Sequence, residues 1–309
     1  MYWLKPFDAV NDTANAVALL RFDWSKEPIM EAGGGDGVFS FIMHGGAFAF
    51  TDDRYNQADP GKSGDIYDVY DRTQKLHIKK TASIFYNLGA DLKISHIYKA
   101  RETGMYRNNQ ILSAIPETLP VKSGVYSTVF LYTFHGLSDY RRSLAEIRRI
   151  IRSDGVLLAI VVNDTVKNNF ICFKLSRFFA RQGWHRISRY FAQLDGGRHD
   201  EIAGLFAKNW IEWVSLLQET GFAIEEVYSQ VSPALWKIYD TQTRPLLKYM
   251  IHCSRFLSKV HLKTLVKFLW ICMWLPILMI SYLLMALPIR LKMDGIPQNV
   301  FIAIKAKPV

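Results

Sequence analysis

Three glycines at alternate positions constrain the fold of this chain more than any other feature. The segment Pro28–Ser40 reads Pro-Ile-Met-Glu-Ala-Gly-Gly-Gly-Asp-Gly-Val-Phe-Ser, so short apolar residues lead to Glu31 and glycines follow at positions 33, 35 and 37. Glycine is needed where the backbone takes a positive φ or approaches a ligand closely. Helix-like residues begin at Val38, and the first N–H groups of a helix are free to bind an anionic group. The pattern predicts a strand, a tight glycine loop and a helix, in that order.

The spacing of these glycines excludes one common nucleotide site. The dinucleotide fingerprint is G-x-G-x-x-G, but the position three after Gly35 is Val38. The spacing present is E-x-G-x-G-x-G. A tight turn without any ligand is the alternative interpretation of the glycines alone.

Strands and helices alternate along most of the chain, which is typical of an α/β fold with a mainly parallel sheet. Apolar and β-branched runs predict strands at residues 28–32, 83–91, 110–114, 125–134, 156–162, 222–230 and 299–305. Helical spacing predicts helices at residues 6–22, 37–45, 92–100, 140–151 and 208–220, the first with Asn11 or Asp12 as its cap. Residues 46–80 interrupt the alternation and are interpreted as an insertion, with a short helix over 76–82. The chain has 309 residues, half of them apolar, which is enough for one large domain with an elaboration.

A second segment extends the glycine pattern to a known family. Residues 114–158 contain an Ile-Pro-Glu-Thr-Leu-Pro turn, a strand, a helix ending in Ile-Ile-Arg-Ser, an Asp-Gly turn and a second strand. Together with E-x-G-x-G-x-G, this order resembles the class I S-adenosylmethionine (SAM)-dependent methyltransferases, over roughly residues 28–45 and 83–231. The sequence departs from the family at Asp154-Gly155, where Pro-Gly-Gly is usual, and at Ala114 or Ile115, where many relatives have an acid facing adenine. The resemblance implies a Rossmann-like, doubly wound, seven-stranded sheet.

The resemblance also implies the residues that would bind SAM. Glu31 would make a polar contact to its methionine moiety, and Gly33, Gly35 and Gly37 would form a wall against it. Asp91, at the end of the second strand, would accept hydrogen bonds from the ribose hydroxyls, as a carboxylate can. Ser113, at the end of the third strand, is the sixth expected cofactor-binding residue.

Other residues leave alternatives open. Asp91 could instead cap the helix that follows it, and Asp53, which also follows an apolar run, is its rival for the ribose. A general base is needed only if the acceptor must lose a proton. His135, just after the fourth strand, and His199, in Gly-Gly-Arg-His-Asp, are the candidates for that catalytic role. Each could equally be an ordinary histidine, hydrogen-bonded in a loop or at the start of a helix.

An uncharged run near the C-terminus indicates a membrane. Residues 268–289 carry no Asp, Glu, Lys or Arg, and Lys263 and Lys267 precede the run while Arg290 and Lys292 follow it. The run is long enough to cross a bilayer. However, the last strand must join the same sheet as the strand at 222–230, and basic residues at both ends favour the same cytoplasmic side. We therefore expect a helical hairpin broken at Pro276, or an element lying in the membrane plane. A buried core helix is the alternative.

A second stretch supports the same interpretation. Residues 167–198 are rich in arginine, lysine and aromatic residues, with Asp195 as their one acid. Such a pattern suits an anionic lipid surface, and relatives often carry a lid over the acceptor here. A solvated helix packed on the core, or a nucleic-acid interface, is the alternative. The net charge of +10 would favour either anionic partner, but no Asn-Pro-Pro-Tyr-like motif supports methylation of nucleic acid.

These observations predict a SAM-dependent methyltransferase at the cytoplasmic face of a membrane, monotopic or peripheral. Its acceptor would be amphiphilic or lipid-linked, and oxygen is the expected methylated atom. The predicted parts are a methyltransferase domain at 1–231, with the insertion at 46–80 and a basic lid region at 164–207, a helical insertion at 232–298, and a final strand at 299–309. Three scattered cysteines predict neither disulfides nor a zinc site. The alternatives are a methyltransferase of soluble sugars or natural products, and a non-catalytic SAM-binding membrane scaffold.

Overall fold

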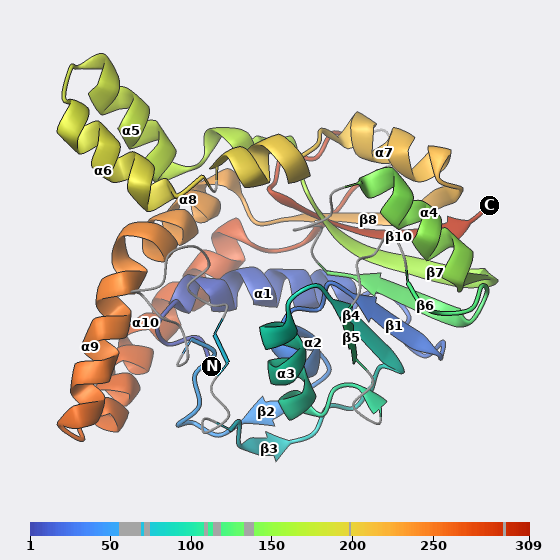
Figure 1. Ribbon diagram of the computed structural model, residues 1–309, viewed down its shortest axis with the longest axis horizontal. Helices are drawn as coiled ribbons and strands as arrows, with labels where there is room; N and C mark the ends of the chain where they lie inside the picture. Colours follow the sequence, from blue (N-terminus) through green and yellow to red (C-terminus); the bar gives the residue numbers. More distant parts are fainter. Residues whose placement is uncertain are drawn as a thin grey trace.

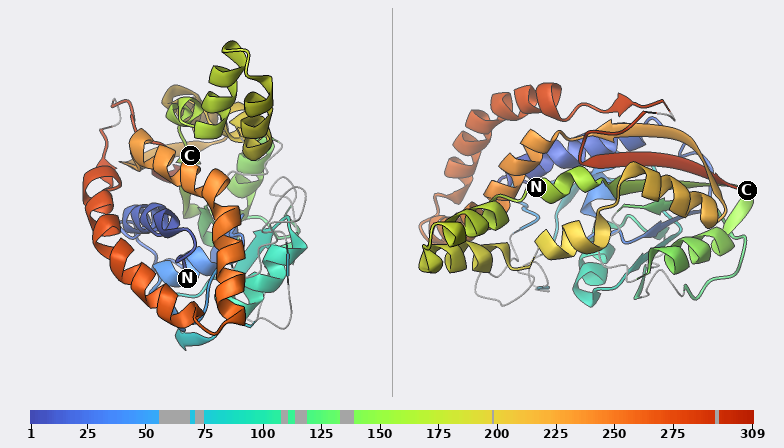
Figure 2. Two further views of the ribbon diagram at one scale, coloured as in Figure 1. Left: turned by 90° about the vertical axis from the view of Figure 1, so that its left-hand side faces the viewer. Right: turned by 90° about the horizontal axis from the view of Figure 1, so that it is seen from above.

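The computed structural model describes residues 1–55, 69–70, 75–107, 111–113, 119–132, 139–197, 199–292 and 295–309. Within these residues, a mixed sheet of eight strands lies at the centre with helices on both faces (Figures 1 and 2). In spatial order its strands are β5 (Ile111–Ser113), β4 (Leu88–Asp91), β1 (Ile29–Ala32), β6 (Tyr126–Leu131), β7 (Ile151–Val162), β10 (Phe301–Pro308), β8 (Phe222–Gln230) and β9 (Ile289–Arg290).

The strand directions confirm the predicted fold class. β1 lies between β4 and β6 and is parallel to both, and β5 and β7 continue the parallel part on either side. The last long strand, β10, is inserted between β7 and β8 and is antiparallel to both. This is the doubly wound arrangement of seven strands expected from the sequence, and the two-residue β9 extends its edge.

Alternate residues of the central strands face two different hydrophobic cores. Met30, Val129 and Leu157 face the core that contains the helices at residues 140–150 and 210–219. Their neighbours Ile29, Phe130 and Leu158 face the core that contains the helices at residues 38–43 and 94–103. Because both faces are covered, these strands are continuous apolar runs.

The helices also follow the sequence pattern closely. They are α1 (Pro6–Leu19), α2 (Val38–Met43), α3 (Ile94–Thr103), α4 (Tyr140–Ile150), α5 (Ile171–Arg181), α6 (His185–Asp195), α7 (Trp210–Glu219), α8 (Pro233–Thr241), α9 (Leu247–Lys259) and α10 (Lys263–Met285). Short 3-10 or π segments cover Asp164–Asn168, Asp200–Phe206 and Gln242–Leu246. In α4, for example, the side chain of Asp139 caps the first turn and one stripe of residues is buried.

Two local predictions in the first eighty residues were wrong. Proline at the first helical position starts α1 at Pro6, so Asn11 and Asp12 lie inside the helix and do not cap it. Residues 78–80 form strand β3 (Ile78–Lys80), not a helix, because they pair antiparallel with β2 (Ala47–Phe48). The described part of the 46–80 insertion therefore contains a small two-stranded sheet outside the main one.

The segment between β8 and β10 contains α8, α9, α10 and β9, in the position predicted for the apolar insertion. Among the described residues, α10 is the helix long and apolar enough to cross a membrane by length and composition. The predicted break at Pro276 was wrong, because α10 continues through it. Side chains before and after Pro276, such as Trp274 and Leu278, pack on the same core and hold one helix axis despite the missing N–H. The turn instead lies at residues 260–262, between α9 and α10.

Candidate functional site

The glycine loop connects β1 to α2 with the backbone geometry that the spacing predicts. Gly33, Gly35 and Gly37 have φ values of 74°, 59° and 70°, in the left-handed region that favours glycine. The N–H of Gly33 donates to the carbonyl oxygen of Ala90 at 2.8 Å, which ties the loop to the neighbouring strand β4. The loop therefore lies at the carboxyl ends of two adjacent parallel strands, where α/β folds bind ligands.

Asp91 ends β4 and reaches this loop. Its Oδ2 accepts a hydrogen bond from the N–H of Gly35 at 3.0 Å, and its Oδ1 accepts one from the N–H of Lys93 at 2.9 Å. The second contact is a turn at the entrance to α3, whose N-cap residue is Lys93 without a side-chain cap, and the ribose role of Asp91 stays a prediction. Nδ1 of His96 lies 3.2 Å from Oδ1. Ser113 lies opposite Asp91 in the register of β5 and β4.

Glu31 is fully buried beneath the loop. Its Oε1 accepts from the hydroxyl of Ser40 at 2.5 Å, and its Oε2 accepts from the hydroxyl of Tyr106 at 2.6 Å. Burial raises the pKa of Glu31 to about 7, although both hydrogen bonds act in the opposite direction. The carboxyl group thus holds α2 and the segment after α3 against the strand end.

Gly34, which is outside the alternate pattern, has less room than its neighbours. A Cβ at Gly34 would lie 2.5 Å from Cδ of Glu31 and 2.7 Å from the hydroxyl oxygen of Tyr106. A Cβ at Gly35 would meet nothing closer than Nδ1 of His96, at 4.0 Å. Gly34 is therefore needed for close packing on Glu31, and Gly35 for its backbone conformation.

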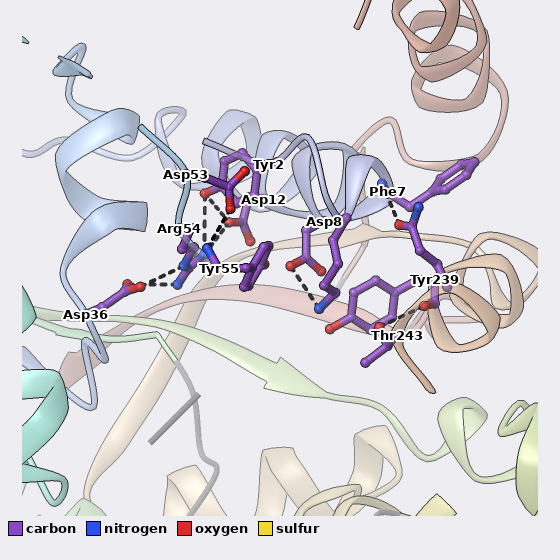
Figure 3. A network of polar contacts seen from close by, with 12 residues as sticks. Tyr2, Phe7, Asp8, Asp12, Asp36, Asp53, Arg54, Tyr55, Tyr239 and Thr243 are labelled. Atoms are coloured by element: carbon purple, nitrogen blue, oxygen red, sulfur yellow. Dashed lines mark hydrogen bonds and ion pairs between the residues drawn. The ribbon is translucent and has the colours of Figure 1, made fainter. Parts of the chain in front are cut away.

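A buried polar network covers the glycine loop on the side of the N-terminus (Figure 3). Arg54 lies at its centre: Nε and Nη2 donate to the carboxylate of Asp36 at 2.8 and 2.9 Å, and Nη1 donates to Asp12 at 3.1 Å. Asp12 also accepts from the hydroxyls of Tyr2 at 2.6 Å and Tyr132 at 2.8 Å. The network joins the N-terminus, α1, the glycine loop, residues 49–55 and the end of β6.

The pKa values in this network are set by burial and by Arg54. Burial alone would raise the pKa of Asp36, but the two-pronged contact with Arg54 holds it below its ordinary range. Burial dominates at Asp12 and raises its pKa, against the effect of the same guanidinium. Because Asp36 stands between Gly35 and Gly37, the ion pair between its carboxylate and Arg54 fixes the loop. Sequence reasoning did not find this network, because no periodicity links Arg54 to Asp12 or Asp36.

Residues 49–55 are held in turn by α10. Nζ of Lys267, which is buried, donates to the carbonyl oxygens of Phe50 and Asp52, the latter at 2.9 Å. Asp53, the rival of Asp91 for the ribose, lies in this loop beside Arg54 and is also buried (Figure 3). Its Oδ1 accepts from the N–H of Tyr55 at 2.8 Å.

The two catalytic candidates stay predictions. His135 lies outside the described residues. The ring of His199 stacks on Phe173 of α5 with centroids 3.4 Å apart, and Nδ1 of the ring lies 2.9 Å from Oδ1 of Asp200. The backbone N–H of His199 donates to the carboxylate of Asp195 at 3.1 Å. These contacts place His199 at the base of the α5–α6 hairpin.

The comparisons with known proteins are structural. No protein-family model matches this sequence, and no curated protein matches it significantly. A structure from Thermotoga maritima, described as a SAM-dependent methyltransferase and possible histamine N-methyltransferase, is 12% identical with a TM-score of 0.52, over 98% of this chain and 92% of that chain. The geranyl diphosphate C-methyltransferase of Streptomyces coelicolor is 11% identical with a TM-score of 0.46, over 96% of this chain and 77% of that chain. With the strand order described above, the first likeness shows that this chain has the class I fold of the SAM-dependent methyltransferases.

Proposed function

We propose that this chain is a SAM-dependent methyltransferase that acts at the cytoplasmic face of a membrane on an amphiphilic or lipid-linked acceptor, with oxygen as the methylated atom. The observation that best supports the proposed methyl transfer is the 3.0 Å hydrogen bond from the N–H of Gly35 to the carboxylate of Asp91. It brings together a glycine loop and a strand-end acid, from adjacent parallel strands of the class I fold. A small ligand with a diol and a charged end would suit that pair.

The residues present fit SAM. A carboxylate has about four lone-pair sites, so Asp91 can accept ribose hydroxyls in addition to its two backbone donors. A Cβ would meet nothing nearer than 4.0 Å at Gly35, so the backbone there is open to close approach. Glu31, fully buried and bonded to Ser40 and Tyr106, would support the loop from below.

When bound, SAM supplies a methyl group on a sulfonium sulfur, and the acceptor atom takes this methyl group by in-line displacement of the sulfur. The tasks left for the protein are to position the two reactants and exclude water. Asp91 and the glycine loop would orient the ribose, and the Arg54 network would keep the loop in one conformation. His135 or His199 would remove a proton if the acceptor hydroxyl must lose one.

The acceptor and the location are supported by surface chemistry. The outer side of α10 exposes large apolar side chains, among them Phe268, Ile280 and Leu284. The α5–α6 hairpin exposes Phe178 and Trp184 among its basic residues. Such surfaces would collect an acceptor that partitions into lipid.

Calorimetry with SAM and with its demethylated product tests the cofactor. We expect both to bind the full chain, and Asp91→Ala to weaken both. The matched control is Asp154→Ala, since Asp154 is an exposed acid paired with Arg152 within β7, where the sequence had wrongly predicted a turn. If neither compound binds, the proposal is overturned.

Mass spectrometry of lipid and metabolite extracts, incubated with the protein and SAM, tests the reaction. We expect an amphiphilic species to gain the mass of one CH₂ group. A shift confined to water-soluble sugars or natural products would favour the soluble-acceptor alternative. SAM binding without transfer to any extract would favour the non-catalytic scaffold.

A further inference from the structure

Helix α10 is packed lengthwise on the domain. Its partly or fully buried residues recur every three or four positions from one end to the other, on a single stripe: Lys263, Val266, Lys267, Trp270, Ile271, Trp274, Leu278, Ser281, Tyr282 and Met285. This is the burial pattern of a helix that covers a core with one face. A helix surrounded by lipid would have no such stripe.

Contacts along the whole length fix this packing. Near the start, Nε1 of Trp270 donates to the carbonyl oxygen of Trp3 at 2.9 Å, and Lys267 holds residues 50–52. In the middle, the rings of Phe7 and Trp274 meet edge to face at 5.6 Å. At the end, the carbonyl oxygen of Met285 accepts from the N–H of Ser232 at 2.7 Å.

These contacts exclude a membrane crossing for this conformation. A crossing helix has its two ends in different aqueous compartments, but the partners of both ends of α10 belong to one folded domain. The helix could cross only by leaving α1, α8 and residues 50–52 and exposing the buried Lys267 amine to lipid. Charged groups in the hydrocarbon core are costly.

The opposite side of α10 is apolar and exposed. Its large side chains with exposed fractions between 44% and 76% are Leu265, Phe268, Leu269, Met273, Leu275, Ile277, Met279, Ile280, Leu283 and Leu284. Contiguous apolar patches of this kind mark sites of protein or membrane interaction. The charge around the patch decides between these partners.

The surroundings of the patch are basic. Residues 241–293 contain lysines and arginines but no aspartate or glutamate. The α5–α6 hairpin, with its own basic and aromatic residues, lies at the same end of the molecule as α9 and α10 (Figures 1 and 2). A second copy of the chain, related by a two-fold axis, would bring like charges together at the rim. An anionic lipid surface would neutralise them.

We infer that α10 lies in the plane of an anionic phospholipid membrane, with its outer face inserted in one leaflet and without crossing it. The basic residues of α9, which packs beside α10, contact the lipid headgroups. The inference deepens the proposed function, on which it rests for the membrane location of the reaction, by naming the lipid partner and the mode of attachment.

Depth measurements on the full chain distinguish lying from crossing. Cys272 on α10 and Cys253 on α9 are exposed, while Cys172 is buried. Every variant carries Cys253→Ser, and in the first an environment-sensitive fluorophore is attached to Cys272. Two further variants carry Cys272→Ser as well, and the fluorophore is attached to the cysteine introduced by Leu265→Cys or by Leu284→Cys. Quenching by lipids spin-labelled at different acyl positions then gives the depth of each site in vesicles of phosphatidylcholine and phosphatidylglycerol.

We expect similar, shallow depths at all three positions. Residues 265 and 284 would be about 28 Å apart along the axis of a helix that rises 1.5 Å per residue. A crossing helix would therefore place the fluorophore at residue 272 far deeper than those at its two ends. That result would overturn the inference.

Flotation with the same vesicles tests the surface itself. Leu283→Gln combined with Leu284→Gln should reduce binding roughly tenfold or more, because two apolar anchors are lost. Ile211→Gln on α7 is the matched control, since Ile211 is 74% exposed and Leu284 76%. Binding should also be weaker to phosphatidylcholine alone and at high salt.

The remaining outcomes separate this inference from the proposed reaction. SAM binding without flotation would overturn the membrane inference and leave the reaction standing. Flotation without SAM binding would overturn the proposed reaction and leave the membrane inference standing. If the protein does not float and light scattering shows that the wild type is a dimer while the double glutamine variant is a monomer, the exposed face of α10 binds a second copy of the chain. That result would overturn the lipid partner.

Discussion

The guanidinium of Arg54 and the carboxylate of Asp36 form a two-pronged ion pair, with Nε–Oδ2 and Nη2–Oδ1 distances of 2.8 and 2.9 Å. The side chains are only 19% and 14% exposed. The pair closes the glycine loop against residues 49–55, which α10 holds through Lys267. The candidate cofactor loop and the apolar helix are thus connected by one short segment of chain.

Arg54→Ala should destabilise the protein by about 3 kcal/mol, because it leaves the buried carboxylates of Asp36 and Asp12 without their cation. Chemical denaturation measures the free energy of unfolding. Arg54→Lys should recover part of it, since an ammonium keeps the charge but loses the planar fork. Arg152→Ala is the control, because the exposed pair of Arg152 and Asp154 should contribute no more than about 1 kcal/mol. Equal effects of the two alanine variants would show that the network does not hold the loop.

Glu31 should make stability depend on pH, because its pKa rises from an ordinary value of 4.5 to about 7 on folding. The folded state then binds a proton more tightly than the unfolded state. The stabilisation is complete below pH 4.5 and is lost as the pH rises through about 7. Over this range the stability of the wild type relative to Glu31→Gln should fall by about 3 kcal/mol, at 1.36 kcal/mol per pKa unit.

Unfolding curves of the wild type and Glu31→Gln at a series of pH values measure this difference. Glu27→Gln is the control, since Glu27 lies at the surface in a pair with Arg107. If the difference between wild type and Glu31→Gln is constant between pH 4.5 and 7, Glu31 does not titrate in this range.

Much of the fold and part of the site could be predicted because their signals are local. Continuous apolar runs predicted the central strands, and the alternate spacing predicted the positive φ values of Gly33, Gly35 and Gly37. The approach of Asp91 to the loop followed from topology, because the carboxyl ends of adjacent parallel strands share one edge.

The remaining contacts had no local signal. Tyr106 is 75 residues from Glu31 and Arg54 is 42 from Asp12, and each partner is chosen by packing alone. Gly34 lies outside the alternate glycine spacing, and the need for glycine there comes from the buried Glu31 and Tyr106 side chains that pack against it. At Pro276, tertiary packing on both sides of the proline outweighed its local tendency to break a helix.

Lys267→Met should destabilise the protein by about 2 kcal/mol, because the carbonyl groups of Phe50 and Asp52 lose their buried donor. Amide exchange of residues 49–55 should accelerate along with the loss of unfolding free energy. Lys259→Met is the matched control, since Lys259 is exposed on α9. If exchange in residues 49–55 does not change, α10 does not stabilise this loop.

Gly34→Ala should be more damaging than Gly35→Ala, although Gly34 lies outside the alternate glycine pattern. A Cβ at Gly34 would come within 2.5 Å of Cδ of Glu31 and 2.7 Å of the Tyr106 hydroxyl, and neither buried group can move freely. We expect a loss of about 3 kcal/mol from such overpacking. At Gly35 the φ of 59° costs a side chain about 1 kcal/mol, and its Cβ would be 4.0 Å from the nearest atom. Thermal unfolding of the two variants checks the order, and a lower melting temperature for Gly35→Ala would show that backbone conformation outweighs packing in this loop.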